Sequence, residues 1–377
     1  MLLSFLQSCF NIGGFKLLWQ VPIASERPLI VYEEMVYLEG FHAGHPEEAN
    51  RIFALDAATG KEIWVSADSV SQIYGVSAGY VFFQDVAKRL VQLDAKTGEK
   101  IYASEDESPQ ILSFLTKGDV LFIVNDSLEV VAVDNRKNKA LWSMQLPSRM
   151  IKKIALQFSG ENLIVSGNYD NTGDFYGSIW ALNAASGKEI WNFEAPEPRD
   201  FAPLDVLVHE SYILATNTSP LLLQTHVLDA DTGKERYPPV PVFTIYGCYG
   251  HTAYASNGNV DLKTGQKQEG EAKWMAGSIL HKGRAWQVQF DHPGGFGSFF
   301  LSTTYDGDYQ GRRDWTNTPP SCSIKGFDLH SGKTLYQTKV CKYTRFSPPV
   351  EANGILYHGS VAMMKQGKSG VWAYRLP

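Results

Sequence analysis

The chain has 377 residues, a formal net charge of −6 and 44% hydrophobic residues, which is enough for a sizeable core. The negative charge gives no electrostatic basis for nucleic-acid binding, and no run of about 20 consecutive apolar residues occurs, so we expect no membrane span. The aromatic content of 12% and the 33 glycines favour an all-β chain with many turns.

The first ten residues are apolar and could be taken for the remnant of a signal peptide. They lack a basic segment, and no cleavage site of small residues follows them. We therefore expect residues 1–14 to be an N-terminal extension and the protein to be cytoplasmic. The alternative is a periplasmic protein in which these residues are the remnant of a signal.

One motif recurs along most of the chain, most clearly in residues 54–64 (ALDAATGKEIW) and 181–191 (ALNAASGKEIW). An apolar strand enters, Asp or Asn caps a turn, Gly supplies a positive φ, and a second strand leaves with an aromatic residue. Both faces of residues 52–55 are apolar, which indicates a strand that is covered on both sides. The pattern predicts hairpins in sheets that lie between two neighbours.

Successive motif anchors are 32 to 49 residues apart, except for the 67 residues between Asp261 and Asp328. The shorter intervals fit one four-stranded blade each, and the long interval predicts a blade with an insertion at about residues 291–320. Two copies are eroded, since Asn138 replaces the glycine of one and the copy at Asp261 lacks the aromatic. The residues expected to build the repeat are Trp19, Asp56, Gly60, Trp64, Asp94, Gly98, Tyr102, Asp134, Trp142, Asn183, Gly187, Trp191, Asp229, Gly233, Tyr237, Asp328, Gly332 and Tyr336.

A polar turn followed by an apolar strand occurs eight times, once more than the hairpins. The two ends account for the difference, because residues 370–375 look like an entering strand and residues 15–19 look like a leaving strand. We therefore predict one domain, residues 15–377, that forms an eight-bladed β-propeller whose last blade pairs the N- and C-terminal strands. Such closure removes free sheet edges. If the Asp261 copy or the insertion is not a true blade, the ring has seven.

The repeat, Leu-Asp-Ala-x-Thr-Gly-Lys-x-x-Trp, resembles the PQQ-like repeat of quinoprotein alcohol dehydrogenase-type propellers from about Phe15 to Pro377. The resemblance implies that the outer-strand aromatics pack against neighbouring blades. The enzymes of that family are much longer and use a vicinal cysteine pair at their cofactor site, and no two cysteines are adjacent here. We therefore expect no cofactor. In size and blade count the chain is similar to the non-enzymatic outer-membrane assembly branch of the family.

The four cysteines do not make a disulfide framework. Cys322 and Cys341 flank one predicted hairpin at nearly symmetric distances from its turn. A cross-strand bridge in an oxidising compartment and two free thiols are both open.

Two loops are the candidate binding segments. His42 and His45 lie in the loop 41–50, where two histidines three residues apart could hold a metal on a helix, but a solvated loop is favoured and no metal is expected. The loop 305–317 carries residue types that are enriched in binding hot spots. Its candidate contact residues are Tyr305, Asp306, Tyr309, Arg312, Arg313 and Trp315. A decorative loop is the alternative.

Three functions are compatible with these features. The first is a monomeric protein-binding scaffold without catalytic activity, one version of which is a bacterial immunity or inhibitor protein that blocks a toxin. The second is an enzyme, a lyase or a quinone-dependent oxidoreductase, that uses the axial funnel of the ring. The third is an envelope assembly scaffold. We favour the first, because no catalytic motif is present in the sequence.

Overall fold

A computed structural model describes residues 16–25, 27–45, 48–105, 107–147, 150–171, 174–194, 204–217, 224–242, 245–255, 257–268, 279–281, 284–291, 321–328, 334–342, 344–346, 350–362 and 369–376. The strands between residues 279 and 346 are described by their backbone alone. None of the described residues forms a helix long and apolar enough to cross a membrane.

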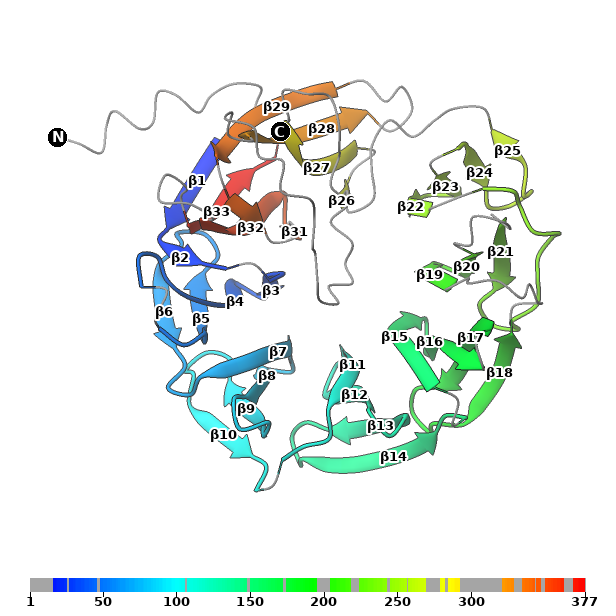
Figure 1. Ribbon diagram of the computed structural model, residues 1–377, viewed down its shortest axis with the longest axis horizontal. Coiled ribbons are helices and arrows are strands. Elements are labelled where there is room, and N and C mark those ends of the chain that lie inside the picture. Colours follow the sequence, from blue (N-terminus) through cyan, green and yellow to red (C-terminus); the bar gives the residue numbers. More distant parts are fainter. Residues whose placement is uncertain are drawn as a thin grey trace.

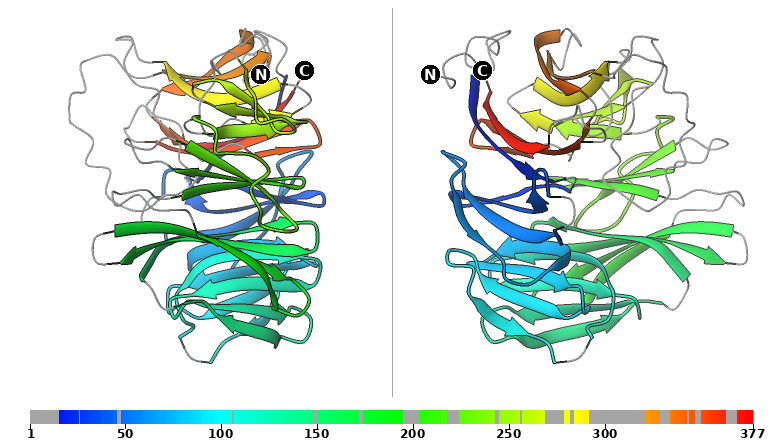
Figure 2. Two further views of the ribbon diagram at one scale, coloured as in Figure 1. Left: turned by 90° about the vertical axis from the view of Figure 1, so that its right-hand side faces the viewer. Right: turned by 60° about the vertical axis from the view of Figure 1, so that its left-hand side comes forward.

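The described strands form eight antiparallel sheets, which surround a central axis as the blades of a ring (Figure 1). This agrees with the number of blades expected from the repeat. The sheets are twisted, and neighbouring blades lie face to face around the ring (Figure 2).

The first four blades follow the chain from residue 23 to residue 194. Blade 1 contains β2 (Ile23–Ala24), β3 (Ile30–Tyr32), β4 (Met35–His42), β5 (Arg51–Asp56) and β6 (Glu62–Val65). Blade 2 contains β7 (Val70–Ser77), β8 (Tyr80–Asp85), β9 (Leu90–Asp94) and β10 (Lys100–Ala103). Blade 3 contains β11 (Ile111–Lys117), β12 (Val120–Asn125), β13 (Glu129–Asp134) and β14 (Lys139–Gln145). Blade 4 contains β15 (Met150–Ser159), β16 (Asn162–Asn171), β17 (Asp174–Asn183) and β18 (Glu189–Glu194).

The other four blades complete the ring. Blade 5 contains β19 (Leu204–His209), β20 (Tyr212–Asn217) and β21 (Gln224–Asp229). Blade 6 contains β22 (Ile245–Tyr249), β23 (Thr252–Ala255), β24 (Asn259–Asp261) and β25 (Lys267–Gln268). Blade 7 contains β26 (Ile279–His281), β27 (Arg284–Asp291), β28 (Ser321–Asp328) and β29 (Thr334–Lys342). Blade 8 contains β30 (Thr344–Phe346), β31 (Val350–Ala352), β32 (Ile355–Ala362), β33 (Gly370–Arg375) and β1 (Lys16–Val21).

The ring closes through the two ends of the chain. β1 pairs antiparallel with β33, with Lys16 opposite Arg375 and Val21 opposite Val371. The two strands lie side by side at the upper left of Figure 1. The predicted closure of the last blade by N- and C-terminal strands is therefore confirmed.

The strand β5 shows why the repeat reads as apolar on both faces. Ile52 and Ala54 pack in one core cluster with residues of blade 2, including Val81. Phe53 and Leu55 pack in another with residues of blade 8. All four side chains of residues 52–55 are buried. Because successive side chains of a strand point to opposite faces, each blade is a layer between two hydrophobic cores.

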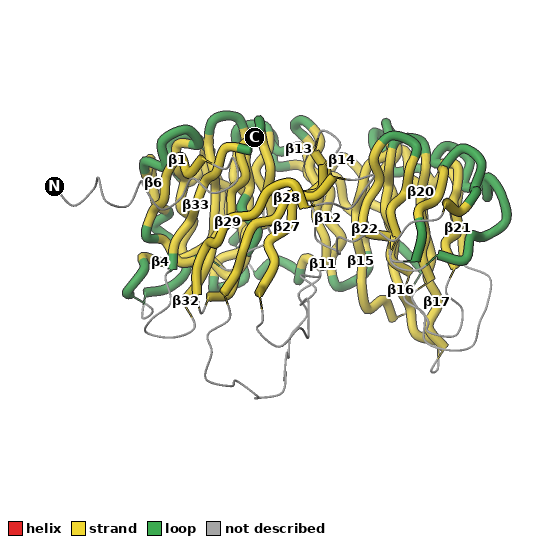
Figure 3. The backbone as a smooth tube through the Cα atoms, turned by 90° about the horizontal axis from the view of Figure 1, so that it is seen from above, coloured by secondary structure: helices red, strands yellow, loops and turns green. Residues whose placement is uncertain are grey.

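The antiparallel order assigns the connections to two faces of the ring. We call the face with the motif turns, such as residues 57–61 and 95–99, the turn face. The opposite face, which we call the loop face, carries the connections between the second and third strands of each blade and those between blades. Residues 43–50 and 86–89 are examples. Figure 3 shows the short turns along the upper rim.

Blade 5 departs from the expected pattern, because the hairpin that starts at Asp229 does not continue into a fourth strand. Within residues 224–242, the outer segment pairs with β21 at two isolated bridges, Thr225 with Val240 and Leu228 with Glu235. This segment contains Pro238, Pro239 and Pro241, and proline has no N–H to donate to a ladder. The expected leaving strand with Tyr237 is thus replaced by an irregular segment.

Candidate functional site

The motif turn is held by its anchor carboxylate. In blade 1, the Asp56 Oδ1 accepts hydrogen bonds from the Thr59 N–H at 2.8 Å and the Thr59 hydroxyl at 2.6 Å. The Thr59 hydroxyl is the main cause that lowers the pKa of the Asp56 carboxyl below its usual value. Gly60 follows with a φ of 71°, a conformation that glycine adopts without the steric cost of a Cβ.

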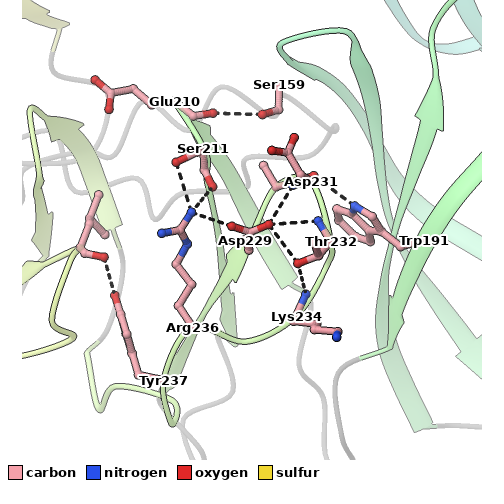
Figure 4. Close-up of polar contacts among 12 residues, drawn as sticks. Ser159, Trp191, Glu210, Ser211, Asp229, Asp231, Thr232, Lys234, Arg236 and Tyr237 are labelled. Carbon is pink, nitrogen blue, oxygen red and sulfur yellow. Dashed lines mark hydrogen bonds and ion pairs between the residues drawn. The ribbon is translucent and has the colours of Figure 1, made fainter.

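The outer-strand aromatics fasten each such turn to the preceding blade. The Trp191 Nε1 of blade 4 donates a hydrogen bond to the Ala230 carbonyl of blade 5 at 3.1 Å, and its ring lies over Gly233. Figure 4 shows the Trp191 indole beside the turn that contains Asp231 and Thr232. A Cβ on Gly233 would lie 2.5 Å from the indole, so glycine is required twice, for its φ of 68° and for this close approach. We call this arrangement of aromatic ring, carbonyl and glycine the aromatic lock.

The aromatic lock recurs at five seams among the described residues. The donor and acceptor pairs are Trp19 with Ala57 at 2.9 Å, Trp64 with Ala95 at 2.9 Å, Trp142 with Ala184 at 3.0 Å, Trp191 with Ala230 at 3.1 Å, and Tyr237 with Leu262 at 3.4 Å. Each ring covers the glycine of the same turn, which is Gly60, Gly98, Gly187, Gly233 or Gly265. The tyrosine version is the longest of the five.

The seam between blades 2 and 3 is built differently. The carbonyl that would accept the aromatic donor belongs to Asn135, and it accepts the side-chain amide of Gln92 at 3.0 Å. Gln92 lies directly opposite Tyr102 in the β9–β10 ladder, where Ala54 lies opposite Trp64 in blade 1. The turn position of the glycine is taken by Asn138, with a φ of 49°. Tyr102 therefore does not form the aromatic lock, although the sequence placed it among the locking residues.

Asn135 adds a second irregularity to this seam. Its side chain is 3% exposed, and neither its Nδ2 nor its Oδ1 has a hydrogen-bond partner. The equivalent residues in the neighbouring turns are Ala57, Ala95 and Ala184. A buried amide without partners opposes folding by about 1–3 kcal/mol, so this seam tolerates a local penalty that the alanines avoid.

The inner part of the same seam is closed. The rings of Tyr74 in β7 and Phe114 in β11 have centroids 5.2 Å apart, and the Ser77 hydroxyl donates to the Gly118 carbonyl at 2.7 Å. Tyr74 also belongs to a buried cluster with Ile111 of blade 3. The missing aromatic lock therefore affects the outer part of the seam and leaves its contacts near the axis in place.

A groove of about 830 Å³ lies at the outer, loop-face end of this seam. Blade 2 contributes Ile101 and Tyr102 of β10, blade 3 contributes Ile111 and Ile123, and the connection between the blades contributes a wall that includes Glu105 and Glu107. We call it the seam groove. Ile101 is 54% exposed, and both glutamates are exposed. The seam groove thus combines an aliphatic floor with an acidic edge.

The connection that borders the seam groove is long and tethered. It spans residues 104–110, whereas residues 66–69 join blades 1 and 2. The Ser104 N–H donates to the Leu90 carbonyl at 2.9 Å, and the Ser108 N–H donates to the Lys88 carbonyl at 2.9 Å. These bonds fix the wall of the seam groove to the third strand and to the β8–β9 turn of blade 2.

The predicted histidine loop lies elsewhere, on the loop face of blade 1. The His42 Nδ1 lies 3.2 Å from Glu48 Oε2, and its Nε2 lies 3.7 Å from Glu62 Oε2. These three side chains are each nearly half exposed, and His45 is exposed. Within the described part of the chain, no group of three or more His, Cys, Asp and Glu residues is arranged to hold a metal ion. The arrangement is a solvated cluster in which His42 contacts two exposed glutamates.

The second predicted loop, with Tyr305, Asp306, Tyr309, Arg312, Arg313 and Trp315, lies outside the described residues. The strands that flank it, β27 and β28, end on the loop face at Asp291 and Ser321, the same face as residues 43–50. Gly332 also lies outside the described residues. Asp328 and Tyr336 are placed by backbone only, opposite Arg284 and Gly326.

The two cysteines of blade 7 lie in register, with Cys322 opposite Cys341 in the β28–β29 pair. Directly opposed residues of an antiparallel pair have Cα atoms about 4.5 to 5.5 Å apart, within the span of a disulfide. The backbone is thus compatible with both alternatives, a bridge and two thiols.

Of the residues that line the seam groove, the sequence singled out only Tyr102, although a signal for a changed seam was present. When the repeats are aligned on their anchors, Gln92 stands where the other copies have Ala54, Ala132, Ala181, Val227, Asn259 and Gly326. Asn135 stands where they have alanine or leucine. Two coordinated polar substitutions on either side of one seam could have indicated a change in its structure.

Comparisons with known proteins identify relatives. A family profile described as outer membrane protein assembly factor BamB, of the PQQ-repeat type, matches residues 48–109 and 111–237, which together make up half of the chain. A search of curated proteins finds no match.

Among solved structures, BamB from Moraxella catarrhalis is similar with 13% identity and a TM-score of 0.55, over 96% of this chain and 100% of that chain. The computationally designed Ika8 protein is similar with 12% identity and a TM-score of 0.59, over 96% and 99%. A quinohemoprotein alcohol dehydrogenase from Pseudomonas putida HK5 has 15% identity and a TM-score of 0.47, over 97% and 76%. At these identities the likeness extends to the fold alone.

Proposed function

The chain belongs to the BamB-type family of PQQ-repeat propellers, and on this premise we propose that it is a protein-binding scaffold that supports the assembly of other proteins. The observation that carries the proposal is the seam groove, a preformed depression with an aliphatic floor and an acidic edge. A depression lined by apolar and acidic side chains offers a partner both surface to bury and charges to complement.

The rigidity of the ring supports this role. Five aromatic locks hold the blades as layers between shared cores. A surface that is already formed in the free protein loses little conformational entropy when a partner binds. Such a ring can therefore present a groove and its loops to a partner without rearrangement.

Two versions of the scaffold differ in the partner. The description of the matched family favours an assembly role at an envelope, which requires a periplasmic location. An immunity or inhibitor protein that binds a toxin is the cytoplasmic version. Fractionation of the cells that make this protein, followed by detection with an antibody, would assign the compartment. We predict that the protein itself is a monomer.

Isolation of the native protein after mild cross-linking, followed by mass spectrometry, tests the proposal. We expect one protein partner in stoichiometric amount, with an envelope component favouring the assembly role and a toxin favouring the inhibitor role. A monomer that carries no partner at native concentration would contradict the scaffold. Quinone-dependent turnover, measured with a dye acceptor, would contradict the absence of catalysis that we predict.

A further inference from the structure

We propose that the seam groove receives an extended segment of the partner protein, which carries aliphatic and basic side chains and adds as a strand to the free edge of β10. The inference rests on the proposed function, since it names the site and the chemistry of the partner. In the sheet order of blade 2, β10 is the last strand and pairs on one side with β9. Its outer backbone groups are available to an added strand.

The floor of the seam groove selects aliphatic side chains. Ile101 on β10 is 54% exposed, and Ile111 on the facing blade is 8% exposed. Covering an exposed isoleucine removes apolar surface from water, which stabilises a complex. Tyr102 also lines the seam groove and is half-buried, and its hydroxyl makes no hydrogen bond to any described residue. A phenol in such a position can contact a partner with its ring and its hydroxyl.

The edge of the seam groove selects basic side chains. Glu105 and Glu107 line the groove and are exposed. Lys88 is 3.6 Å from Glu107, with both side chains about 70% exposed, so this pair is screened by water and leaves the edge acidic. A Lys or Arg at the end of the added segment would meet these carboxylates.

Two other seams, between blades 1 and 2 and between blades 4 and 5, provide a comparison within the same molecule. Ile63 of β6 and Ile190 of β18 stand in the same repeat position as Ile101 and are 46% and 44% exposed. Each is followed by a tryptophan that is held in an aromatic lock. The blade 1 seam also has the short connection 66–69. These two isoleucines are exposed to a similar degree as Ile101 but do not line the seam groove. They therefore serve as matched controls for Ile101.

Peptide binding to the full-length protein tests the inference. The probe is a fluorescein-labelled peptide, Lys-Val-Thr-Val-Thr-Val-Lys, measured by fluorescence polarisation. Two further peptides carry Glu in place of both Lys, or Pro in place of the central Val. We expect the basic peptide to bind, the acidic peptide to bind at least about tenfold more weakly, and the proline peptide to lose binding, because proline cannot complete the ladder.

Variants of exposed residues locate the binding site. I101S should weaken the basic peptide by about tenfold, whereas the matched controls I63S and I190S should leave its affinity unchanged. The double variant E105K/E107K should bind the acidic peptide better than the basic one. Near-UV circular dichroism of each variant checks that the ring is intact.

Three results would overturn the inference. They are equal weakening by I101S and I63S, an unchanged preference in E105K/E107K, and binding of the proline peptide as tight as that of its parent. Failure here is distinct from failure of the scaffold. If the native protein isolates with a partner and the I101S variant does so equally well, the scaffold stands and the site is wrong. If the peptides bind as expected and no partner is isolated, the peptide-binding site stands and the scaffold function is wrong.

Discussion

The seam between blades 1 and 2 and the seam between blades 2 and 3 are adjacent, and the same repeat positions build both. At the first, Trp64 donates to the Ala95 carbonyl and covers Gly98. At the second, Gln92 donates to the Asn135 carbonyl and Tyr102 lines an open groove. The difference teaches that one backbone acceptor can be satisfied by either an indole or an amide. Only the indole also fills the outer space between the blades.

The tryptophan of the first seam should contribute most to stability. Trp64 is 9% exposed, and its replacement in W64A removes a large buried ring and a hydrogen bond, which should cost about 3–5 kcal/mol. Y102A should cost less than about 1.5 kcal/mol, because the ring is half-buried and unlocked. Urea unfolding followed by tryptophan fluorescence and circular dichroism measures both. Equal losses would mean that the two seams are closed equally well.

The turn glycine gives a second comparison. Gly98 has a φ of 73°, and a Cβ there would lie 2.7 Å from the Trp64 Cδ2. G98A should therefore cost about 2 kcal/mol through backbone strain and displacement of the indole. N138G, at the matching position of blade 3, should be neutral or slightly stabilising, since Asn138 has a φ of 49°. Thermal unfolding of both variants checks this, and a destabilised N138G would contradict it.

A buried histidine makes the closing blade sensitive to mild acid, in contrast to the second seam. Burial lowers the pKa of His358 to about 4 from its usual value of 6.5, and its ring stacks on Trp372 with centroids 5.1 Å apart. The unfolded chain takes up a proton below pH 6.5 that the folded protein does not. Stability should therefore fall as the pH decreases from 6.5 towards 4, by up to about 1.4 kcal/mol per pH unit.

Urea midpoints at pH 7.5 and pH 5.5 measure this fall, and H358N serves as the control because asparagine does not titrate. The variant should lose most of the dependence on pH in this window. If Y102A or N135A, rather than H358N, removed the dependence of stability on pH, the acid-sensitive group would lie at the second seam.

Removal of the buried amide should strengthen the second seam. N135A restores the alanine of the neighbouring turns and keeps the backbone carbonyl that accepts the Gln92 amide. We expect a gain of about 1 kcal/mol, because two buried polar atoms without partners are removed. Differential scanning calorimetry measures the gain. A loss of stability would indicate that water or a ligand satisfies Asn135 in solution.

Stronger acid should lower the stability of the second seam and of the closing seam, between blades 8 and 1, to a similar extent. Hydrogen bonds from the turn lower the pKa of Asp134 at the second seam and of Asp56 at the closing seam below the usual value of 3.8. In Asp134 the largest cause is the Lys137 N–H. A carboxyl with a lowered pKa stabilises the fold above pH 3.8 and loses this effect as the pH falls further. Between pH 5 and pH 3, the unfolding temperatures of D134N and D56N should each depend slightly less on pH than that of the unchanged protein, and by a similar amount.

The ring itself could be predicted from the sequence because the repeat is redundant. Seven anchors specify the same turn, so the loss of Gly at Asn138 or of the aromatic after Asp261 does not hide the pattern. The terminal half-motifs were sufficient to predict the pairing of β1 with β33. The prediction of a fourth strand in blade 5 was wrong, because Pro238, Pro239 and Pro241 prevent the hairpin that begins at the turn from continuing as a regular ladder.

The seam groove could not be predicted in the same way, because Tyr102 still satisfies the motif. Its different role depends on what lies opposite in the ladder, Gln92, and on a side chain from the next turn, Asn135. Both contacts depend on register and on the packing of two blades, which are properties of the folded ring. His42 and His45 were chosen by residue type, but both are exposed, and His42 contacts Glu48 and Glu62 rather than a ligand site.

The pairing of β1 with β33 also has a consequence for biosynthesis. These strands bring Lys16 opposite Arg375, so β1 waits until β33 has been synthesised before its ladder can form. Contacts between such distant segments form late, since a long loop must close first. Until then β1 and the open side of blade 1 offer unpaired edges to other nascent chains. Chaperone binding during translation would be concentrated there, and the pairing of β1 with β33 would end it.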